Sequence, residues 1–222
     1  MDRSLRGSAA HVLVTDVEQP VASVDAMHHL GRVLRLRDGE PVTVTDGAGR
    51  WRACAFGDKR LEPVDEIRSV HPPTTLLTIA VAAPKGDRLE WLIAKCTEVG
   101  VDRIVLLDAE RSVVRWKEER GAKQLDRLRR VASEAAMQSR RVWLPEIAGP
   151  VAPEDVFSSA AVAEPGSRPV AKEDVSIAVG PEGGWSPAEL ACAHDTVSLG
   201  PHVLRVETAA VAAAVLMVRV RQ

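Results

Sequence analysis

One short segment combines glycines, a carboxylate and the start of a helix. Residues 179–190 read VGPEGGWSPAEL and follow the apolar run VSIAV at 175–179. Glycines let a backbone approach a ligand closely, and Ser186 with Glu189 has the spacing of a capping box. Glu182 would repel a phosphate, so the segment favours a neutral or cationic ligand, such as the sulfonium S-adenosylmethionine or a nucleoside. The alternative is a tight strand-to-helix turn that binds nothing.

Two further segments could complete such a site. Residues 197–211, VSLGPHVLRVETAAV, again run from a strand through Gly-Pro into a helix. The residues around Glu164-Pro165 form a third candidate loop. Ligands of open α/β sheets bind beyond the carboxyl ends of the strands, so these loops could line one crevice. A Walker lysine and a dinucleotide-binding glycine pattern are both missing from the segments.

Positive charge gathers in one part of a chain whose net charge is −2. Between Arg111 and Arg141 the sequence has ten Lys or Arg against four acids. Such a region attracts phosphates, although many charge runs are only solvated helix faces. The adjacent pairs Arg129-Arg130 and Arg140-Arg141 favour nucleic acid. His28-His29 lacks a third nearby ligand, so we expect no metal site.

Composition and pattern predict a globular α/β protein. Three scattered cysteines indicate a reducing compartment, and the absence of a signal sequence or an apolar span predicts a cytoplasmic protein. Residues 1 to about 70 resemble short strands with one helix that Asp25 caps and Asp38-Gly39 ends. The hairpin 41–56 turns at Asp46-Gly47, and prolines in 71–75 mark a domain boundary.

From residue 75 onward, apolar strands alternate with helices, which predicts a parallel sheet covered on both faces. The strands are expected in LLTIAVAA, DRIVLLDA, VSIAV and TVSLG, and one helix is expected to end at Gly100. We expect residues 158–174 to be loop-rich. The final helix, ETAAVAAAVLMVRV, is apolar on almost all sides. A second subunit could cover it, and the alternative is that it lies deep in its own sheet layer.

These segments together resemble one known family. HHLGRVLRLRDGE, KGDRLEWLIAKCTEVGVDRI, ERSVV, SEAAMQSRR, VGPEGGWSPAEL and SLGPHVLRVETAA occur in the order seen in the RsmE-type 16S ribosomal RNA uridine-N(3) methyltransferases of the SPOUT class. The resemblance implies a PUA-like, RNA-binding β-barrel at residues 1–72. It implies a SPOUT-type α/β domain with a C-terminal trefoil knot at residues 73–222, and a homodimer.

The resemblance also implies a cofactor, S-adenosylmethionine, a substrate, 16S rRNA of the small ribosomal subunit, and no metal or membrane. It places cofactor contacts at Val179, Gly180, Pro181, Glu182, Gly183, Gly184, Leu199, Gly200, Pro201, Leu204 and Glu164. Catalytic candidates are Arg205, Glu134, Gln138, Arg141, Arg111 and Glu207. RNA-binding candidates are Arg32, Arg35, Arg127, Arg130 and Arg140. The chain departs from the family pattern at Val206, where Thr is usual, at Met137 for Glu and at Arg140 for Gly, and mildly at Val99.

Transfer of a methyl group to uracil N(3) requires alignment, removal of the N(3) proton and stabilisation of the uracil anion. Arg205 is the first candidate for the anion, and Glu134 or Glu207 for the base. Three alternatives stay open. These are a non-catalytic RNA-binding protein, a related enzyme that acts on another base or on transfer RNA, and, from the residues alone, a nucleotide-binding enzyme that prefers NAD or ATP.

Overall fold

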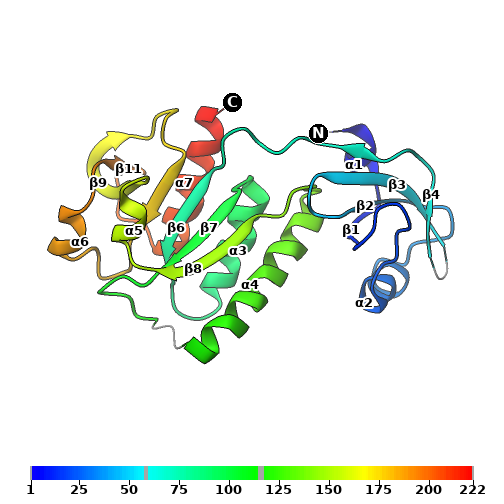
Figure 1. Ribbon diagram of the computed structural model, residues 1–222, viewed down its shortest axis with the longest axis horizontal. Helices are drawn as coiled ribbons and strands as arrows, with labels where there is room; N and C mark the ends of the chain where they lie inside the picture. The colour runs from blue at the N-terminus through cyan, green and yellow to red at the C-terminus, as the bar shows by residue number, and fades with distance from the viewer. Residues whose placement is uncertain (1, 58–59, 115–117, 222) are drawn as a thin grey trace. The chain divides into compact units, whose positions relative to one another are not determined.

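The computed structural model describes residues 2–57, 60–114 and 118–221, and it divides the chain into two compact units. Unit 1 consists of residues 1–73 and 133–144, and unit 2 of residues 74–132 and 145–222. Each unit has its own sheet (Figure 1).

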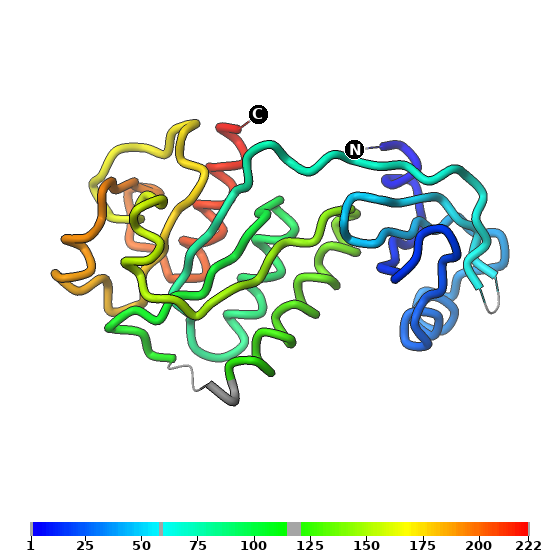
Figure 2. Tube along the Cα trace, in the orientation of Figure 1, coloured from blue at the N-terminus to red at the C-terminus, as the bar shows by residue number. Residues whose placement is uncertain are grey.

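Unit 2 is built on six parallel strands in the order β11-β9-β10-β6-β7-β8. This order differs from the order along the chain, as the colours in Figure 2 show. The strands are β6 (Thr78–Ala82), β7 (Arg103–Leu107), β8 (Glu146–Val151), β9 (Ala161–Pro169), β10 (Ser176–Val179) and β11 (Thr196–Ser198). The predicted parallel sheet is therefore confirmed.

Alternate residues of the central strands enter two separate apolar clusters. Ile79 and Val81 of β6 pack with helices α3 (Arg88–Val99), α4 (Glu118–Gln138) and α7 (Val206–Arg221). Ala80 and Ala82 pack in a second cluster, which contains Phe157 of α5 (Glu154–Phe157) and Trp185, just before α6 (Pro187–Ala191). Side chains of a strand point to opposite faces in turn, so both faces of the sheet are covered, as predicted.

Glycine ends α3 where the sequence predicts it. Gly100 has φ +113°, and its amide donates to the carbonyls of Cys96 and Thr97. The left-handed conformation is accessible to glycine without steric cost, so Gly100 stops the helix and turns the chain toward β7.

One prediction for this half of the chain is wrong, and one strand was not predicted. Residues 158–174 are not a continuous loop, because β9 occupies Ala161–Pro169 within them. Pro165 and Gly166 suggested a loop, but β9 lies between β10 and β11, and its pairing with both decides its conformation. The pattern also gave no indication of β8, which contains Gly149 and Pro150.

Unit 1 contains a five-stranded sheet with the path β1-β2-β3-β4, in which β5 also pairs with β3. The strands are β1 (Ala10–Leu13), β2 (Pro41–Thr45), β3 (Arg50–Phe56), β4 (Leu61–Pro63) and β5 (Arg68–Ser69). The predicted β2–β3 hairpin is confirmed. In the described part of the chain no ladder joins β1 to β4, so these pairings alone do not close a barrel.

The helical part of unit 1 begins and ends elsewhere than the sequence predicts. After the short α1 (Arg3–Gly7), α2 covers Val24–His28 and continues as a π-helical turn, η1 (His29–Val33). Ser23, and not Asp25, is the N-cap, because its hydroxyl accepts from the Ala26 amide. The turn ends at Val33, before Asp38-Gly39, and Arg35 then adopts φ +56°.

His11 lies in the interior of unit 1 and ties β1 to the segment after α4. Its Nε2 lies 3.1 Å from the Arg141 carbonyl, and its Nδ1 lies 2.8 Å from the Thr43 hydroxyl. The carbonyl can only accept, so Nε2 carries the proton and Nδ1 accepts from Thr43. Burial lowers the pKa of His11 to about 4, with a further contribution from the charge of Arg140.

The buried His11 predicts a loss of stability in acid. The unfolded chain takes up a proton near pH 6.5, whereas the folded chain stays neutral until about pH 4. The free energy of unfolding should therefore fall as the pH drops through this window. Between pH 7 and pH 5 the wild type should lose about 2 kcal/mol more than a His11→Gln variant in urea titrations. Equal losses in the two proteins would contradict the assignment.

Candidate functional site

A pocket of about 470 Å³ lies in unit 2, at the carboxyl ends of strands β10 and β11 and beside the middle of β9. Its walls come from three segments, namely 163–165, 179–185 and 199–209. The lining residues are Ala163, Glu164, Pro165, Val179, Gly180, Pro181, Glu182, Gly184, Trp185, Leu199, Gly200, His202, Val203, Leu204, Arg205, Val206 and Ala209. All expected cofactor contacts except Gly183 and Pro201 lie on this wall, and so does Arg205.

The loop from Gly180 to Ser186 is held by two devices. Ser186 and Glu189 form the predicted capping box, with Glu189 Oε2 2.8 Å from the Ser186 amide. Arg111 donates from Nη1 to the carbonyls of Gly183 and Trp185, each at 3.2 Å. Arg111, expected to be catalytic, thus holds the loop that forms one wall, and Gly183 faces Arg111.

Trp185 explains why a glycine stands at position 180. A Cβ atom at Gly180 would lie 2.8 Å from Cε2 of the Trp185 ring, well inside van der Waals contact. The ring is 6% exposed and packs edge-on against Phe157, with 5.0 Å between the ring centroids. Its Nε1 is buried and has no hydrogen-bond partner in the described part of the chain.

The third wall is an irregular part of β9. The pairing of β9 with β11 jumps from Val162 opposite Thr196 to Arg168 opposite Val197. The intervening residues leave the β9–β11 ladder, and Glu164 and Pro165 among them line the pocket. The segment predicted as a loop is therefore a bulged strand.

Several lining residues were not anticipated, namely Ala163, Trp185, His202, Val203 and Ala209. His202 and Val203 lie on the wall between Gly200 and Leu204, and Val203 is 87% exposed. Val206, which departs from the family pattern, is buried at the start of α7 and also lines the pocket.

Arg88, which the sequence did not single out, lies near two carboxylates at the pocket, those of Glu182 and Glu207. Arg88 Nη1 lies 3.7 Å from Glu182 Oε1 and 3.9 Å from Glu207 Oε1. Glu207, in the first turn of α7, is only 9% exposed, and its Oε2 has no hydrogen-bond partner in the residues described.

Three other catalytic candidates belong to unit 1 and not to the unit that holds the pocket. Glu134 and Gln138 are exposed on the second half of α4, and Arg141 follows that helix. The Arg141 carbonyl lies at the His11 ring. The roles of these three residues stay predictions.

Met137 and Arg140, which depart from the family pattern, make structural contacts in unit 1. Met137 Sδ accepts from the Leu13 amide at 3.3 Å. Arg140 has φ +61°, a conformation that favours glycine, the residue usual in the family. Its guanidinium donates to the Ser8 carbonyl at 2.9 Å and to the Met137 carbonyl at 3.2 Å, and burial lowers its pKa.

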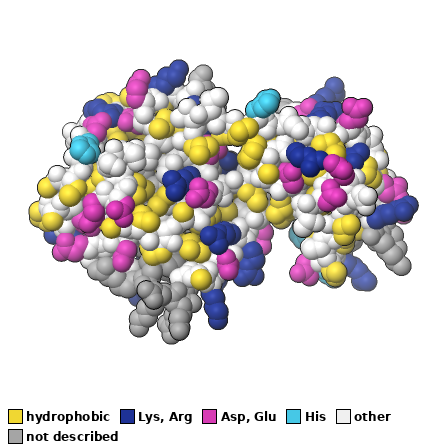
Figure 3. Space-filling model, viewed as in Figure 1, with side chains coloured by type: hydrophobic (Ala, Val, Ile, Leu, Met, Phe, Trp, Pro, Cys, Tyr) yellow, Lys and Arg dark blue, Asp and Glu magenta, His cyan; other side chains and the backbone are white. Residues whose placement is uncertain are grey.

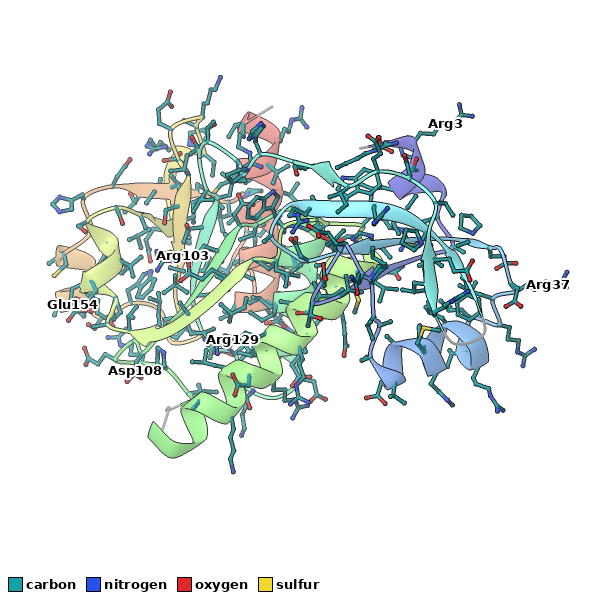
Figure 4. The ribbon with its side chains drawn as sticks, turned by 45° about the vertical axis from the view of Figure 1, so that its right-hand side comes forward. Arg3, Arg37, Arg103, Asp108, Arg129 and Glu154 are labelled. Carbon is teal, nitrogen blue, oxygen red and sulfur yellow. The ribbon has the colours of Figure 1, made fainter. Side chains whose placement is uncertain are left out.

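The remaining basic candidates lie at the surface. Arg32, Arg35 and Arg130 are exposed, and neighbouring Arg37 points away from unit 1 in Figure 4. Arg127 pairs with Glu90 at 2.6 Å. On the face that Figure 3 shows, Lys and Arg side chains lie among Asp and Glu. Arg115 and Lys117 of the basic region lie outside the described residues.

The described residues form neither a metal-binding cluster nor a membrane-spanning helix. No group of three or more His, Cys, Asp or Glu side chains in residues 2–57, 60–114 and 118–221 is arranged to hold a metal ion. No helix in the same part of the chain is long and apolar enough to cross a bilayer.

The close approach of Trp185 to Gly180 predicts that Gly180→Ala destabilises unit 2. The new methyl group must displace the ring or the loop, which should lower the free energy of unfolding by about 1–3 kcal/mol. Gly121→Ala is the matched control. Its Cβ would meet no atom of the described residues within 4 Å, and alanine in a helix should raise stability by about 0.5–1 kcal/mol. Equal effects in chemical denaturation would contradict the steric argument.

The left-handed Arg140 predicts an inverted order of two substitutions. Arg140→Gly and Arg140→Ala both remove the bonds to the Ser8 and Met137 carbonyls, but only glycine relieves the backbone. The glycine variant should therefore be more stable by about 1 kcal/mol in urea denaturation. A more stable alanine variant would mean that the conformation is not strained.

Two domain families match the chain. An RNA methyltransferase domain matches residues 71–218, and an RNA methyltransferase PUA domain matches residues 24–62.

Relatives of known name agree with these matches. The ribosomal RNA small subunit methyltransferase E of Mycobacterium bovis is 35% identical over 87% of this chain and 83% of its own length. That of Synechocystis is 35% identical over 82% of this chain and 67% of its own length. A Legionella pneumophila methyltransferase solved with bound cofactor SAM is 27% identical, with a TM-score of 0.78 over 93% of this chain and 96% of that one. The chain belongs to the RNA methyltransferase family that includes the ribosomal RNA small subunit methyltransferases E.

Proposed function

We propose that this protein methylates N(3) of a uridine in 16S ribosomal RNA of the small ribosomal subunit, with S-adenosylmethionine as the methyl donor. One observation carries the proposal. Both Gly-Pro segments and the bulge of β9 line a single pocket at the carboxyl edge of a parallel sheet. The chain belongs to an RNA methyltransferase family, and a relative of similar fold was solved with SAM bound.

The residues of the pocket fit this cofactor. About 470 Å³ lies within the range of small-molecule sites. The glycines expose backbone groups that can hold an adenosine, and Glu182 on the wall suits a positively charged sulfonium. When bound, S-adenosylmethionine supplies an electrophilic methyl group.

The chain must bind the uracil, orient it, remove its N(3) proton and stabilise the resulting charge. Arg205 is exposed on the pocket wall, so its guanidinium can pair with the uracil oxygens. Glu207, two residues further on, and Glu134 on α4 are the candidate bases. Gln138 and Arg141 are proposed to help orient the RNA. The target base must leave any stack to enter the pocket.

The proposal also includes the fold of each domain. Residues 1–72 form a PUA-like barrel that binds RNA, and residues 73–222 form the SPOUT domain, with its C-terminal segment threaded as a trefoil knot. The exposed arginines Arg32 and Arg35 of unit 1 support the RNA-binding role. The protein acts in the cytoplasm.

A homodimer is also part of the proposal. Helices α3 and α7 pack on one another, and each leaves a large apolar side chain in solvent. Trp91 of α3 is 48% exposed and Val215 of α7 is 47% exposed. A second copy would remove these side chains from water.

Methyl transfer to small ribosomal subunits tests the proposal. Subunits from a strain that lacks the activity should accept label from S-adenosylmethionine and yield N(3)-methyluridine, identified by mass. Arg205→Gln should lower kcat about 100-fold, because it removes charge stabilisation at the reacting base. Arg103→Gln, an exposed arginine at the first position of β7 and so at the opposite edge of the sheet, is the control.

The arms of the experiment separate the alternatives. Naked 16S RNA and transfer RNA run beside the subunits, and a product on transfer RNA alone would replace the substrate. Cofactor binding without transfer to any of these RNAs would overturn the substrate assignment. RNA binding without cofactor binding would favour a non-catalytic RNA-binding protein. Binding of NAD or ATP in place of S-adenosylmethionine would favour a nucleotide-binding enzyme.

A further inference from the structure

Arg88 lies near two of the segments that line the pocket, residues 179–185 and 199–209. Its Nη1 is within ion-pair distance of Glu182 in the first Gly-Pro loop and of Glu207 in the first turn of α7. Its Nε donates to the Lys85 carbonyl at 3.1 Å. The guanidinium is therefore anchored by one nitrogen, while another faces two carboxylates.

The position of Arg88 is unfavourable for its own helix. Arg88 is the first residue of α3, where the partial positive charge of the helix end disfavours a cation. The two carboxylates offset this repulsion. They also need a cation themselves, since Glu207 is 9% exposed and its Oε2 has no hydrogen-bond partner in the described chain. A buried carboxylate without such compensation is costly.

Arg88 is shared between its two partners. Both separations, 3.7 Å to Glu182 and 3.9 Å to Glu207, are longer than a hydrogen bond. The guanidinium thus lies between the two carboxylates and forms a short hydrogen bond with neither of them.

We propose that Arg88 is a positioning residue, which pairs with Glu182 and Glu207 to hold the Gly180–Gly184 loop in register with the start of α7. This inference rests on the proposed function, because the pocket that it shapes is the cofactor pocket. Glu182 and its neighbours Pro181 and Gly184 line one wall, while Arg205 and Val206 directly precede Glu207 on another. Arg88 itself is not on the wall, so it acts through these carboxylates.

Cofactor affinity tests the inference without any need for turnover. Calorimetric titration of S-adenosylmethionine into the full chain should give a Kd about tenfold higher for Arg88→Gln than for wild type. Arg88→Lys keeps the charge and should restore part of the affinity. Lys95→Gln, which breaks the Lys95–Glu98 pair of the same helix (2.8 Å), should leave Kd unchanged. Unchanged affinity in Arg88→Gln would overturn the inference.

A double-mutant cycle shows whether Arg88 acts through Glu182. In a Glu182→Gln background, Arg88→Gln should raise Kd by clearly less than tenfold, because the shared contact is already lost. Additive effects would overturn the coupling. Each variant is titrated well below its unfolding temperature, so a general loss of stability does not mimic the result. If the wild type does not bind S-adenosylmethionine, the proposed function fails and not merely the role of Arg88.

Discussion

The pocket depends on the place of β9 in the sheet. This strand lies between β10 and β11, so its residues Glu164 and Pro165 stand beside the segments that follow those two strands. Parallel pairing leaves no freedom in this respect, because every strand points the same way. In a regular ladder Glu164 and Pro165 would pair with β11. The bulge of β9 releases them from this pairing, and they line the pocket instead. Strand order thus assembles one site from residues far apart in the chain.

Arginines hold the walls of this site. Arg111 donates to two carbonyls of the loop from Gly180 to Ser186, and Arg88 faces carboxylates of that loop and of α7. Backbone carbonyls and carboxylates can only accept hydrogen bonds, so a planar guanidinium with several donors suits such a role. The sequence suggested that the basic region from Arg111 to Arg141 binds nucleic acid. Arg111, its first residue, instead donates hydrogen bonds to the loop from Gly180 to Ser186.

Local signals in the sequence predicted local structure well. Apolar runs gave strands β6, β7 and β10, Ser186 with Glu189 gave the start of α6, and the Gly-Pro motifs gave most of the pocket wall. What failed depends on distant partners. The conformation of β9 follows from its pairing with strands on both sides. The role of Arg88 can be recognised only once Glu182 and Glu207 are seen to lie beside it. His11 looked like an ordinary strand residue until Arg141, 130 positions away, came beside it.

Unit 1 is not a continuous stretch of chain. Besides residues 1–73 it includes residues 133–144, whose Met137 accepts from Leu13 and whose Arg140 donates to Ser8. During synthesis on the ribosome the first 73 residues therefore emerge without these partners. Polar groups of these residues that bond to residues 133–144 find their hydrogen-bond partners only after the chain has been extended past residue 144. The amino-terminal part of this protein is made first but completed only after half of the remaining chain has followed it.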